Sequence, residues 1–452
     1  MRGVSIRVTR SHKQKGKQKI MKKNKTLMAS ALVFSGLAAL AGSGWAHASE
    51  SITTMEGLTT CLTTNNSTCI LGGDIAVNGI IDIPESIKTS LDLNGHRLYE
   101  NESQALLIEN HGDLAISDSS TTIGSCDATI KVKDNGKLEI SNGTFNDEVK
   151  ADTSVGGVSN TSIKISGGVF NKFVSAIDKG TVDISNGVFN DSVSFGYNNA
   201  QVSATISGGT FHNVYNSSGA SMVINSGTFD KVSSNGNDTI NDGTFKGTLF
   251  VGDPGSSLVI NGGTFSDINA INYEEGSSLT ITGGKFTEGF SIGLENVSIT
   301  GGTFYNGATE SDGWMSLHLE HPDTQKYSIT GGTFLNTGDD NGVLMKIKTI
   351  TRPTLASIQS LFTGGTVLNG TVIELDKSEN LSAYWSYIKK QKTDADGDIA
   401  VPDTGSVTKS GDELKAIGGI VAAAVMLFTA GSFMVFKSRK ELFRKKVGFN
   451  KK

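Results

Sequence analysis

Three aspartates near the C-terminal end of the chain have a spacing that could bind calcium. Asp394, Asp396 and Asp398 alternate as carboxylates do at the start of an EF-hand loop, which also needs a glycine at its sixth position and a glutamate at its twelfth. Ile399 and Gly405 occupy those two positions. We therefore interpret the segment as a solvated acidic linker, and we predict no metal site and no cofactor.

The three cysteines could instead support redox chemistry. Cys61 and Cys69 lie eight residues apart near the first expected strand, whereas Cys126 is far from both. In an exported protein the first two could form a disulfide that fixes the N-terminal end of the fold. Three buried free thiols are the alternative, and the sequence leaves both open. The chain has no CxxC spacing, which argues against a metal site built from cysteines.

The charges of the chain are segregated. Residues 1–48 hold 10 bases and no acid, and residues 406–452 hold 10 bases and 3 acids, so residues 49–404 have 20 bases against 42 acids, a net charge of −22. Such a surface repels phosphate backbones, and we predict no nucleic-acid partner. The chain also lacks GxSxG, HExxH and phosphate-loop motifs, and we predict no catalytic residues.

One hexapeptide recurs ten times in the chain and sets the period of the expected strands and bends. It begins at an isoleucine and ends at a phenylalanine, with a mean spacing of 21 residues between successive phenylalanines. Its fourth residue is always Gly and its third is Gly in six copies, so we expect a tight bend with positive φ that lets both apolar ends point inward. The residue two before the isoleucine is usually apolar, as a half-buried strand requires, but Asp238 breaks this pattern. The copies begin at Ile140, Ile165, Ile184, Ile206, Ile224, Ile240, Ile260, Ile281, Ile299 and Ile329.

Short strands joined by bends at this period indicate the coils of an all-β parallel solenoid. Over roughly residues 70–375 the chain resembles right-handed parallel β-helix proteins of the pectate-lyase-like superfold, and the run from Leu91 to Gly95, LDLNG, looks like the strand that often begins such helices. We expect about 14 coils stacked over roughly 65–70 Å.

Many proteins of that superfold cleave acidic polysaccharides, which makes an enzyme the alternative function. Lyases of this kind use a basic residue with calcium-binding carboxylates, and hydrolases use paired aspartates with basic residues nearby. Residues 49–404 contain two arginines, Arg97 and Arg352, which lie in distant coils. A polyanionic substrate would also meet a strongly acidic surface. We therefore expect a protein that is not an enzyme.

Each open end of a solenoid must be covered to prevent edge-to-edge pairing. We predict a short N-terminal cap helix over Thr54–Leu62, with its apolar residues on one face. We also predict a C-terminal cap helix over Ser378–Lys390. Its apolar residues at helical spacing are Leu381, Tyr384, Trp385 and Ile388.

The interval between Phe304 and Phe334 is 30 residues, nine more than the mean, and contains Trp314. Insertions on one face of a solenoid often bind ligands, so Trp314 is the candidate ligand contact. A loop without a function is the alternative. His318 and Glu320, in the same interval, would share one face of a strand, and we interpret them as outward polar residues rather than metal ligands.

The N-terminal 48 residues have the organisation of a secretory signal peptide. The uncharged stretch Leu27–Ala46 follows several lysines and ends in Ala46-His47-Ala48, which predicts cleavage between Ala48 and Ser49. An uncleaved membrane anchor is the alternative, because 20 apolar residues can span a bilayer. Met21 is a second candidate for the start of the protein, since the residues before it add nothing to the signal.

The C-terminal residues resemble the LPXTG cell-wall sorting signal of Gram-positive-type surface proteins. Val401-Pro402-Asp403-Thr404-Gly405, with Val401 in place of the usual Leu, precedes an apolar stretch at 416–436 and a basic tail at 437–452. The resemblance implies that a sortase cleaves after Thr404 and joins its carboxyl group to peptidoglycan. The apolar stretch is long enough to span a bilayer with the basic tail on the cytoplasmic side, and a plain membrane anchor is the alternative.

These features together predict a secreted protein of the cell surface and cell wall. Residues 49–375 would form the β-helix ectodomain, and residues 376–400 a cap helix and linker before the sorting signal. We expect a rigid stalk or an adhesin-like binding surface, whose partner would be a host or neighbouring cell-surface glycan or protein. A wall-anchored polysaccharide lyase or glycoside hydrolase is the alternative.

Overall fold

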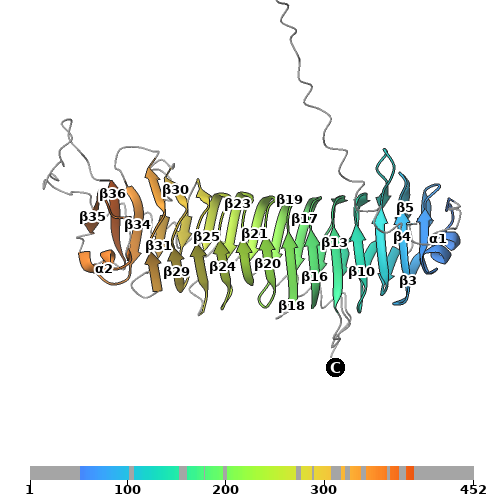
Figure 1. Cartoon of the computed structure of the whole chain (residues 1–452), viewed down its shortest axis with the longest axis horizontal. Coiled ribbons are helices and arrows are strands. Elements are labelled where there is room, and N and C mark those ends of the chain that lie inside the picture. Colours follow the sequence, from blue (N-terminus) through green and yellow to red (C-terminus); the bar gives the residue numbers. More distant parts are fainter. Residues whose placement is uncertain are drawn as a thin grey trace, which may run out of the picture. The chain divides into compact units, whose positions relative to one another are not determined.

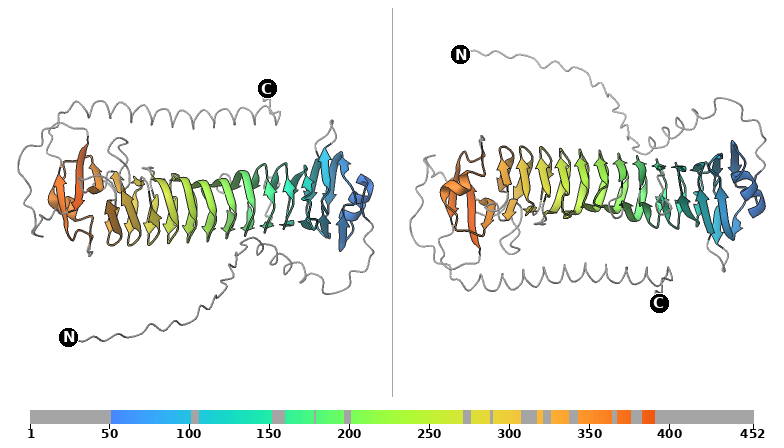
Figure 2. Two further views of the ribbon diagram at one scale, coloured as in Figure 1. Left: turned by 90° about the horizontal axis from the view of Figure 1, so that it is seen from above. Right: turned by 90° about the horizontal axis from the view of Figure 1, so that it is seen from below.

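The chain divides into two units, Met1–Lys390 and Gln391–Lys452, and all the residues described below belong to the first. The computed structural model describes residues 51–100, 106–151, 160–177, 179–196, 201–270, 276–287, 290–306, 317–320, 326–336, 343–363, 367–375 and 383–390. These residues form a parallel β-solenoid whose coils stack from α1 to β36 (Figure 1). Views from above and below show the same stack of strands (Figure 2). The predicted all-β parallel β-helix is confirmed.

One sheet runs the length of the solenoid, and each coil contributes a single strand to it. All of its pairings are parallel, so sequential coils lie side by side. Its 13 strands are β1 (Ser67–Ile70), β4 (Lys88–Asp92), β7 (Asp113–Ser117), β10 (Lys137–Ile140), β13 (Thr161–Ile165), β16 (Lys179–Ile184), β18 (Gln201–Ile206), β20 (Ser221–Ile224), β22 (Asn237–Ile240), β24 (Ser257–Ile260), β26 (Ser278–Ile281), β29 (Asn296–Ile299) and β32 (Lys326–Ile329).

The remaining strands form a second sheet on the other side of the core. In the early coils and most of the late coils each turn contributes two short strands. Each middle coil contributes one long strand, which a bulge interrupts in several pairings. The early strands are β2 (Ile75–Val77), β3 (Gly79–Ile83), β5 (Arg97–Glu100), β6 (Leu106–Asn110), β8 (Ser125–Cys126), β9 (Thr129–Val132), β11 (Thr144–Phe145), β12 (Val149–Ala151), β14 (Val169–Phe170) and β15 (Val174–Ala176). The long strands are β17 (Val188–Phe195), β19 (Thr210–Asn216), β21 (Thr228–Ser234), β23 (Thr244–Val251) and β25 (Thr264–Ala270). The late strands are β27 (Lys285–Phe286), β28 (Phe290–Ile292), β30 (Thr303–Asn306), β31 (Leu317–Glu320), β33 (Thr333–Asn336), β34 (Val343–Thr349), β35 (Thr371–Leu375) and β36 (Tyr384–Lys390).

The isoleucines and phenylalanines of the hexapeptide form two ladders through the core. Each isoleucine is in register with the isoleucine of the next coil and is buried. The ten phenylalanine rings from Phe145 to Phe334 stack in sequence, with centroids 4.5–5.0 Å apart and planes within 13° of parallel. The expectation that both residues point inward is therefore confirmed.

Glycine occurs at the two central hexapeptide positions for different reasons. The fourth residue has positive φ in every copy, for example 103° at Gly263. The third residue does not. Where it is Gly, the coil before approaches closely: a Cβ on Gly262 would lie 2.4 Å from the carbonyl oxygen of Asn241. The expectation of positive φ thus holds for the fourth position, and close backbone approach explains the glycines at the third.

The N-terminal end of the solenoid is capped by helix α1 (Met55–Leu62), as predicted. Its N-cap is Thr54, whose Oγ1 accepts a hydrogen bond from the backbone N–H of Gly57 at 3.1 Å. This satisfies one of the amide groups that a helix start leaves unpaired. Leu58 and Leu62, one turn apart, are buried against the first coils.

The C-terminal cap differs from the prediction, because the described part of Ser378–Lys390 is a strand and not a helix. Strand β36 pairs antiparallel with β34 and β35, and a short helix, α2 (Leu355–Gln359), lies between β34 and β35 in the chain. Ser386 and Ile388 are buried while Trp385 and Tyr387 are less so, which is the period of a strand. Strand β36 forms hydrogen bonds with the backbone N–H and C=O groups at the open edge of the last coils. These contacts with residues far away in the sequence favour a strand more than the helical spacing of the apolar residues favours a helix.

Asp238, which breaks the apolar pattern, has a buried carboxyl group that accepts three hydrogen bonds. It lies on β22 in register between Met222 and Leu258 and is 3% exposed. Its Oδ1 accepts hydrogen bonds from Asn216 Nδ2 at 2.6 Å and from the Met222 backbone N–H at 2.9 Å, and its Oδ2 accepts one from Ser234 Oγ at 2.6 Å. Burial raises the pKa of the Asp238 carboxyl to about 7.

The stacked rings generate the first prediction. Phe265→Ala should lower the free energy of unfolding by about 3–5 kcal/mol, because it leaves a cavity between two stacked neighbours. Gly263→Val should also destabilise, since its φ of 103° disfavours a β-branched residue. The controls are Phe334→Ala, at the half-buried end of the ladder, and Gly73→Ala, where φ is not positive. Denaturant unfolding measures all four. Losses in the controls as large as in the core variants would contradict the prediction.

The second prediction concerns pH. Between about pH 4 and 7 the folded protein keeps the Asp238 proton that the unfolded chain releases, so the free energy of unfolding should fall as the pH rises through this window. Asp238→Asn is neutral throughout and removes this dependence. Between pH 4 and 7 the parent should therefore lose on the order of 3–4 kcal/mol more than the variant in denaturant unfolding. Parallel pH curves for the two proteins would show that the carboxyl group titrates normally.

Candidate functional site

Several of the predicted site residues lie outside the described residues. These are the cleavage site at Ala48 and Ser49, the candidate contact Trp314, the acidic linker at 394–398 and the sorting motif from Val401 to Gly405. The predicted membrane span at 416–436 also lies outside them. Among the helices of the described ranges, none is long and apolar enough to cross a bilayer. These assignments stay predictions.

The two cysteines of the N-terminal cap are bonded to each other. Cys61 on α1 and Cys69 on β1 form a disulfide, with their Cα atoms 5.9 Å apart, which ties the cap helix to the first strand of the solenoid. Cys126 is buried and free. Burial raises the pKa of its thiol to about 12, so Cys126 stays protonated and packs as a small apolar side chain.

His318 and Glu320 lie on a strand, as predicted. Strand β31 pairs with β28 and β34, and His318 is in register between Ser291 and Lys346. Within the described part of the chain, no group of three or more His, Cys, Asp or Glu side chains is placed to hold a metal ion.

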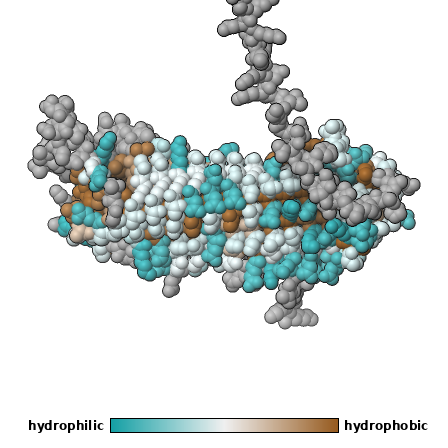
Figure 3. All heavy atoms as spheres, in the orientation of Figure 1, coloured by the Kyte–Doolittle hydropathy of each residue, from teal (hydrophilic) through white to brown (hydrophobic). Residues whose placement is uncertain are grey.

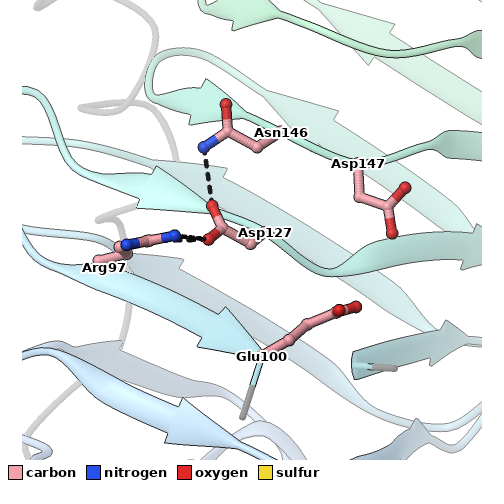
Figure 4. Close-up of a pocket in the computed structure, with 5 residues that line it drawn as sticks. All are labelled: Arg97, Glu100, Asp127, Asn146 and Asp147. Atoms are coloured by element: carbon pink, nitrogen blue, oxygen red, sulfur yellow. Dashed lines mark hydrogen bonds and ion pairs between the residues drawn. The ribbon is translucent and has the colours of Figure 1, made fainter. Parts of the chain in front are cut away.

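A shallow, open pocket of about 440 Å³ lies on the second sheet near the N-terminal end of the solenoid (Figure 4). Arg97 and Glu100 begin and end β5, Asp127 follows β8, and Asn146 and Asp147 follow β11. Strands β5, β8 and β11 pair in parallel register, so three successive coils bring these five polar side chains together. Four of the five lining side chains are ionisable, which makes this pocket the candidate functional site.

Asp127 is the centre of this pocket. Arg97 Nε donates a hydrogen bond to Asp127 Oδ2 at 2.8 Å, and Arg97 Nη2 donates to the same oxygen. On the other side, Asn146 Nδ2 donates to Asp127 Oδ1 at 2.7 Å (Figure 4). The hydrogen bond from Arg97 to Asp127 raises the pKa of the guanidinium, which therefore stays charged.

Asp147, beside this ion pair, is also engaged. Its Oδ2 accepts a hydrogen bond from Thr129 Oγ1 at 2.7 Å, and its Oδ1 accepts one from the Glu148 backbone N–H at 2.9 Å. Arg97 is the one cation among the five lining residues, and a guanidinium held by a carboxylate is poorly suited to remove a proton. The hydrogen bonds of Asp127 with Arg97 and Asn146 link three successive coils. The pocket could also contact a small polar ligand.

A line of side-chain hydrogen bonds leaves the pocket along the solenoid. Asn171 Nδ2 donates to Asn146 Oδ1, and Asn190 Nδ2 donates to Asn171 Oδ1, each at 2.7 Å. Each of these asparagines directly follows a ladder phenylalanine, so the core stack sets their spacing. The repeated FN dipeptide is the sequence signal for this row.

The sequence offers less signal for Asp127 itself. It follows Cys126, which takes the ladder position in a coil that has no hexapeptide. The alignment of Cys126 with Phe145 becomes visible only when the strands are paired.

We compared the chain with protein-family models, curated proteins and solved structures. No family model, curated protein or solved structure matches it.

The pocket generates the third prediction. Asp127→Asn removes the charge that Arg97 contacts but keeps the size of the side chain. The free energy of unfolding should fall by about 1 kcal/mol, because water screens a guanidinium that is 55% exposed. Asp183→Asn, on the exposed face of β16, is the control and should change stability by less than about 0.5 kcal/mol. Thermal and denaturant unfolding compare the three proteins. Equal stability of all three would show that the Arg97–Asp127 pair contributes nothing to the fold.

Proposed function

We propose that this protein is exported and wall-anchored, and that its right-handed parallel β-helix, of the pectate-lyase-like superfold, displays a binding surface away from the cell. The export and anchoring steps rest on the signal peptide of residues 1–48 and the sorting signal that begins at Val401. The partners in these steps are the secretion machinery, a sortase and peptidoglycan. The fold supports the display part of the proposal.

The observation that carries the proposal is the uninterrupted phenylalanine ladder. Ten rings stack from Phe145 to Phe334 with nearly constant spacing, so neighbouring coils are held in one orientation. Thirteen parallel strands at about 4.8 Å extend on the order of 60 Å, close to the length expected from the repeat count. A rod of this length suits a stalk that holds a surface away from the wall.

The surface chemistry supports display rather than self-association. On the face seen in Figure 3, the middle coils are mainly pale and teal, and apolar residues occur in small separate areas. A net charge of −22 over residues 49–404 favours solubility and opposes self-association. The polysaccharide-active alternative has weaker support, because Arg97 is the one cation that lines the described pocket and it is bound to Asp127.

The anchoring proposal leads to the fourth prediction. Thr404→Ala should leave the protein in the membrane fraction, because the resemblance to the sorting signal implies that the sortase recognises the threonine side chain before it cleaves after residue 404. Fractionation of cells expressing the full chain, with release of wall proteins by a muralytic enzyme, measures the outcome. Asp403→Ala, at the variable position of the motif, is the control and should still reach the wall. Attachment of the Thr404 variant to peptidoglycan would contradict sorting.

The display proposal leads to the fifth prediction. The purified full chain should bind cell-surface glycans on an array or intact cells. Trp314→Ala should weaken this binding, because Trp314 lies in the long interval between Phe304 and Phe334. The same assays should be read for cleavage of the polysaccharides. Depolymerisation of an acidic polysaccharide by the parent protein would favour the enzyme instead.

A further inference from the structure

Two exposed aromatic side chains occupy one column on the long strands of the second sheet. Tyr215 on β19 is 42% exposed and Phe250 on β23 is 38% exposed. Both are paired in register with Ser233 on β21, one from each side. The two side chains therefore start two coils apart, which is about 9.6 Å at the spacing of β-strands.

The column alternates small and large residues. Ser194 precedes Tyr215, and Ser233 separates it from Phe250. Both serines are half-buried, and their side chains are much smaller than those of Tyr215 and Phe250.

The ring of Phe250 is seated against the backbone. Its Cε1 and Cζ atoms lie over Gly252, where an added Cβ would be 2.3 Å from both. Gly252 is buried beneath the ring, and its φ is not in the positive range that would by itself require glycine. The absence of a side chain at Gly252 therefore allows the ring to lie close to the sheet, as an ordered surface feature.

Polar side chains lie two to four residues before the aromatic column on the same strands. Lys231 and Lys246 are exposed on β21 and β23, and His212 Nδ1 lies 3.3 Å from Asp230 Oδ2. Two separated rings among polar residues are too small an apolar area for a typical protein partner or a membrane. Rings that offer apolar contact beside hydrogen-bonding groups are instead suited to a ligand that is itself apolar on its faces and polar at its edges.

We propose that Tyr215 and Phe250 bind an extended β-linked polysaccharide that runs parallel to the solenoid axis. Pyranose rings have apolar C–H faces and hydroxyl groups around their edges, and alternate sugars of such a chain recur at about the distance between the two aromatic residues. One sugar would stack on Tyr215, the next would lie over Ser233, and a third would stack on Phe250. This inference rests on the proposed display function and names the ligand class of its surface.

The test uses the purified full chain and defined hexasaccharides in isothermal titration calorimetry. Cellohexaose and chitohexaose are the β-linked probes, and maltohexaose is the matched control because it contains the same sugar as cellohexaose in an α-linked, coiled chain. We expect at least one β-linked probe to bind at least tenfold more tightly than maltohexaose. Tyr215→Ala and Phe250→Ala should each weaken that binding at least tenfold, and Tyr215→Phe should retain it.

Two further variants separate ring position from folding. Gly252→Ala keeps both aromatic residues but displaces the Phe250 ring, and it should weaken binding as Phe250→Ala does. Tyr99→Ala removes an aromatic side chain in a distant coil and should leave binding unchanged. Far-ultraviolet circular dichroism and thermal unfolding check that all variants keep the solenoid.

The outcomes distinguish this inference from the display function on which it rests. If folded Tyr215 and Phe250 variants bind like the parent, if maltohexaose binds equally well, or if the protein binds cells but neither β-linked probe, the aromatic pair is not a polysaccharide site. If the parent binds neither cells nor any glycan, the display function itself fails.

Discussion

The stacking of one phenylalanine per coil is the constraint on which the rest of this structure depends. Ring centroids 4.5–5.0 Å apart match the separation of paired strands, so the ladder and the backbone hydrogen bonds are satisfied by the same geometry. Both sets of contacts form only if each coil turns sharply between its isoleucine and its phenylalanine, and the glycine with positive φ permits this turn. The remainder of each coil is then free to vary, and the distance between successive phenylalanines ranges from 16 to 30 residues.

Much of the fold could be predicted because its determinants are local and repeated. Ten copies of the hexapeptide predict the same bend. The cap residue and the apolar face of helix α1 lie within nine consecutive residues. The C-terminal cap could not be predicted in the same way. The apolar residues near Trp385 fit a helix by spacing, but the choice of a strand depends on the unpaired edge of β34, which is far away in the sequence.

Asp238 and Asp127 could not be explained from the sequence either, because their hydrogen-bond partners lie in neighbouring coils. Asp238 looked like an error in an apolar pattern, and its explanation requires Asn216 and Ser234, which the coil before and the preceding turn bring to the same point. Asp127 was missed because Cys126 substitutes for the ladder phenylalanine in its coil. Both sites depend on which residues of neighbouring coils lie in register, and the varying loop lengths hide that register from the sequence.

The two ends of the solenoid are closed by segments unlike the coils between them, a disulfide-linked helix at one end and antiparallel strands at the other. Each internal coil packs chiefly against the coil on either side. Duplication or loss of one whole coil would therefore rejoin equivalent bends and leave both closures intact. Variants of such a gene that differ in copy number would encode rods of graded reach, changing by about 4.8 Å per coil, without a newly adapted core.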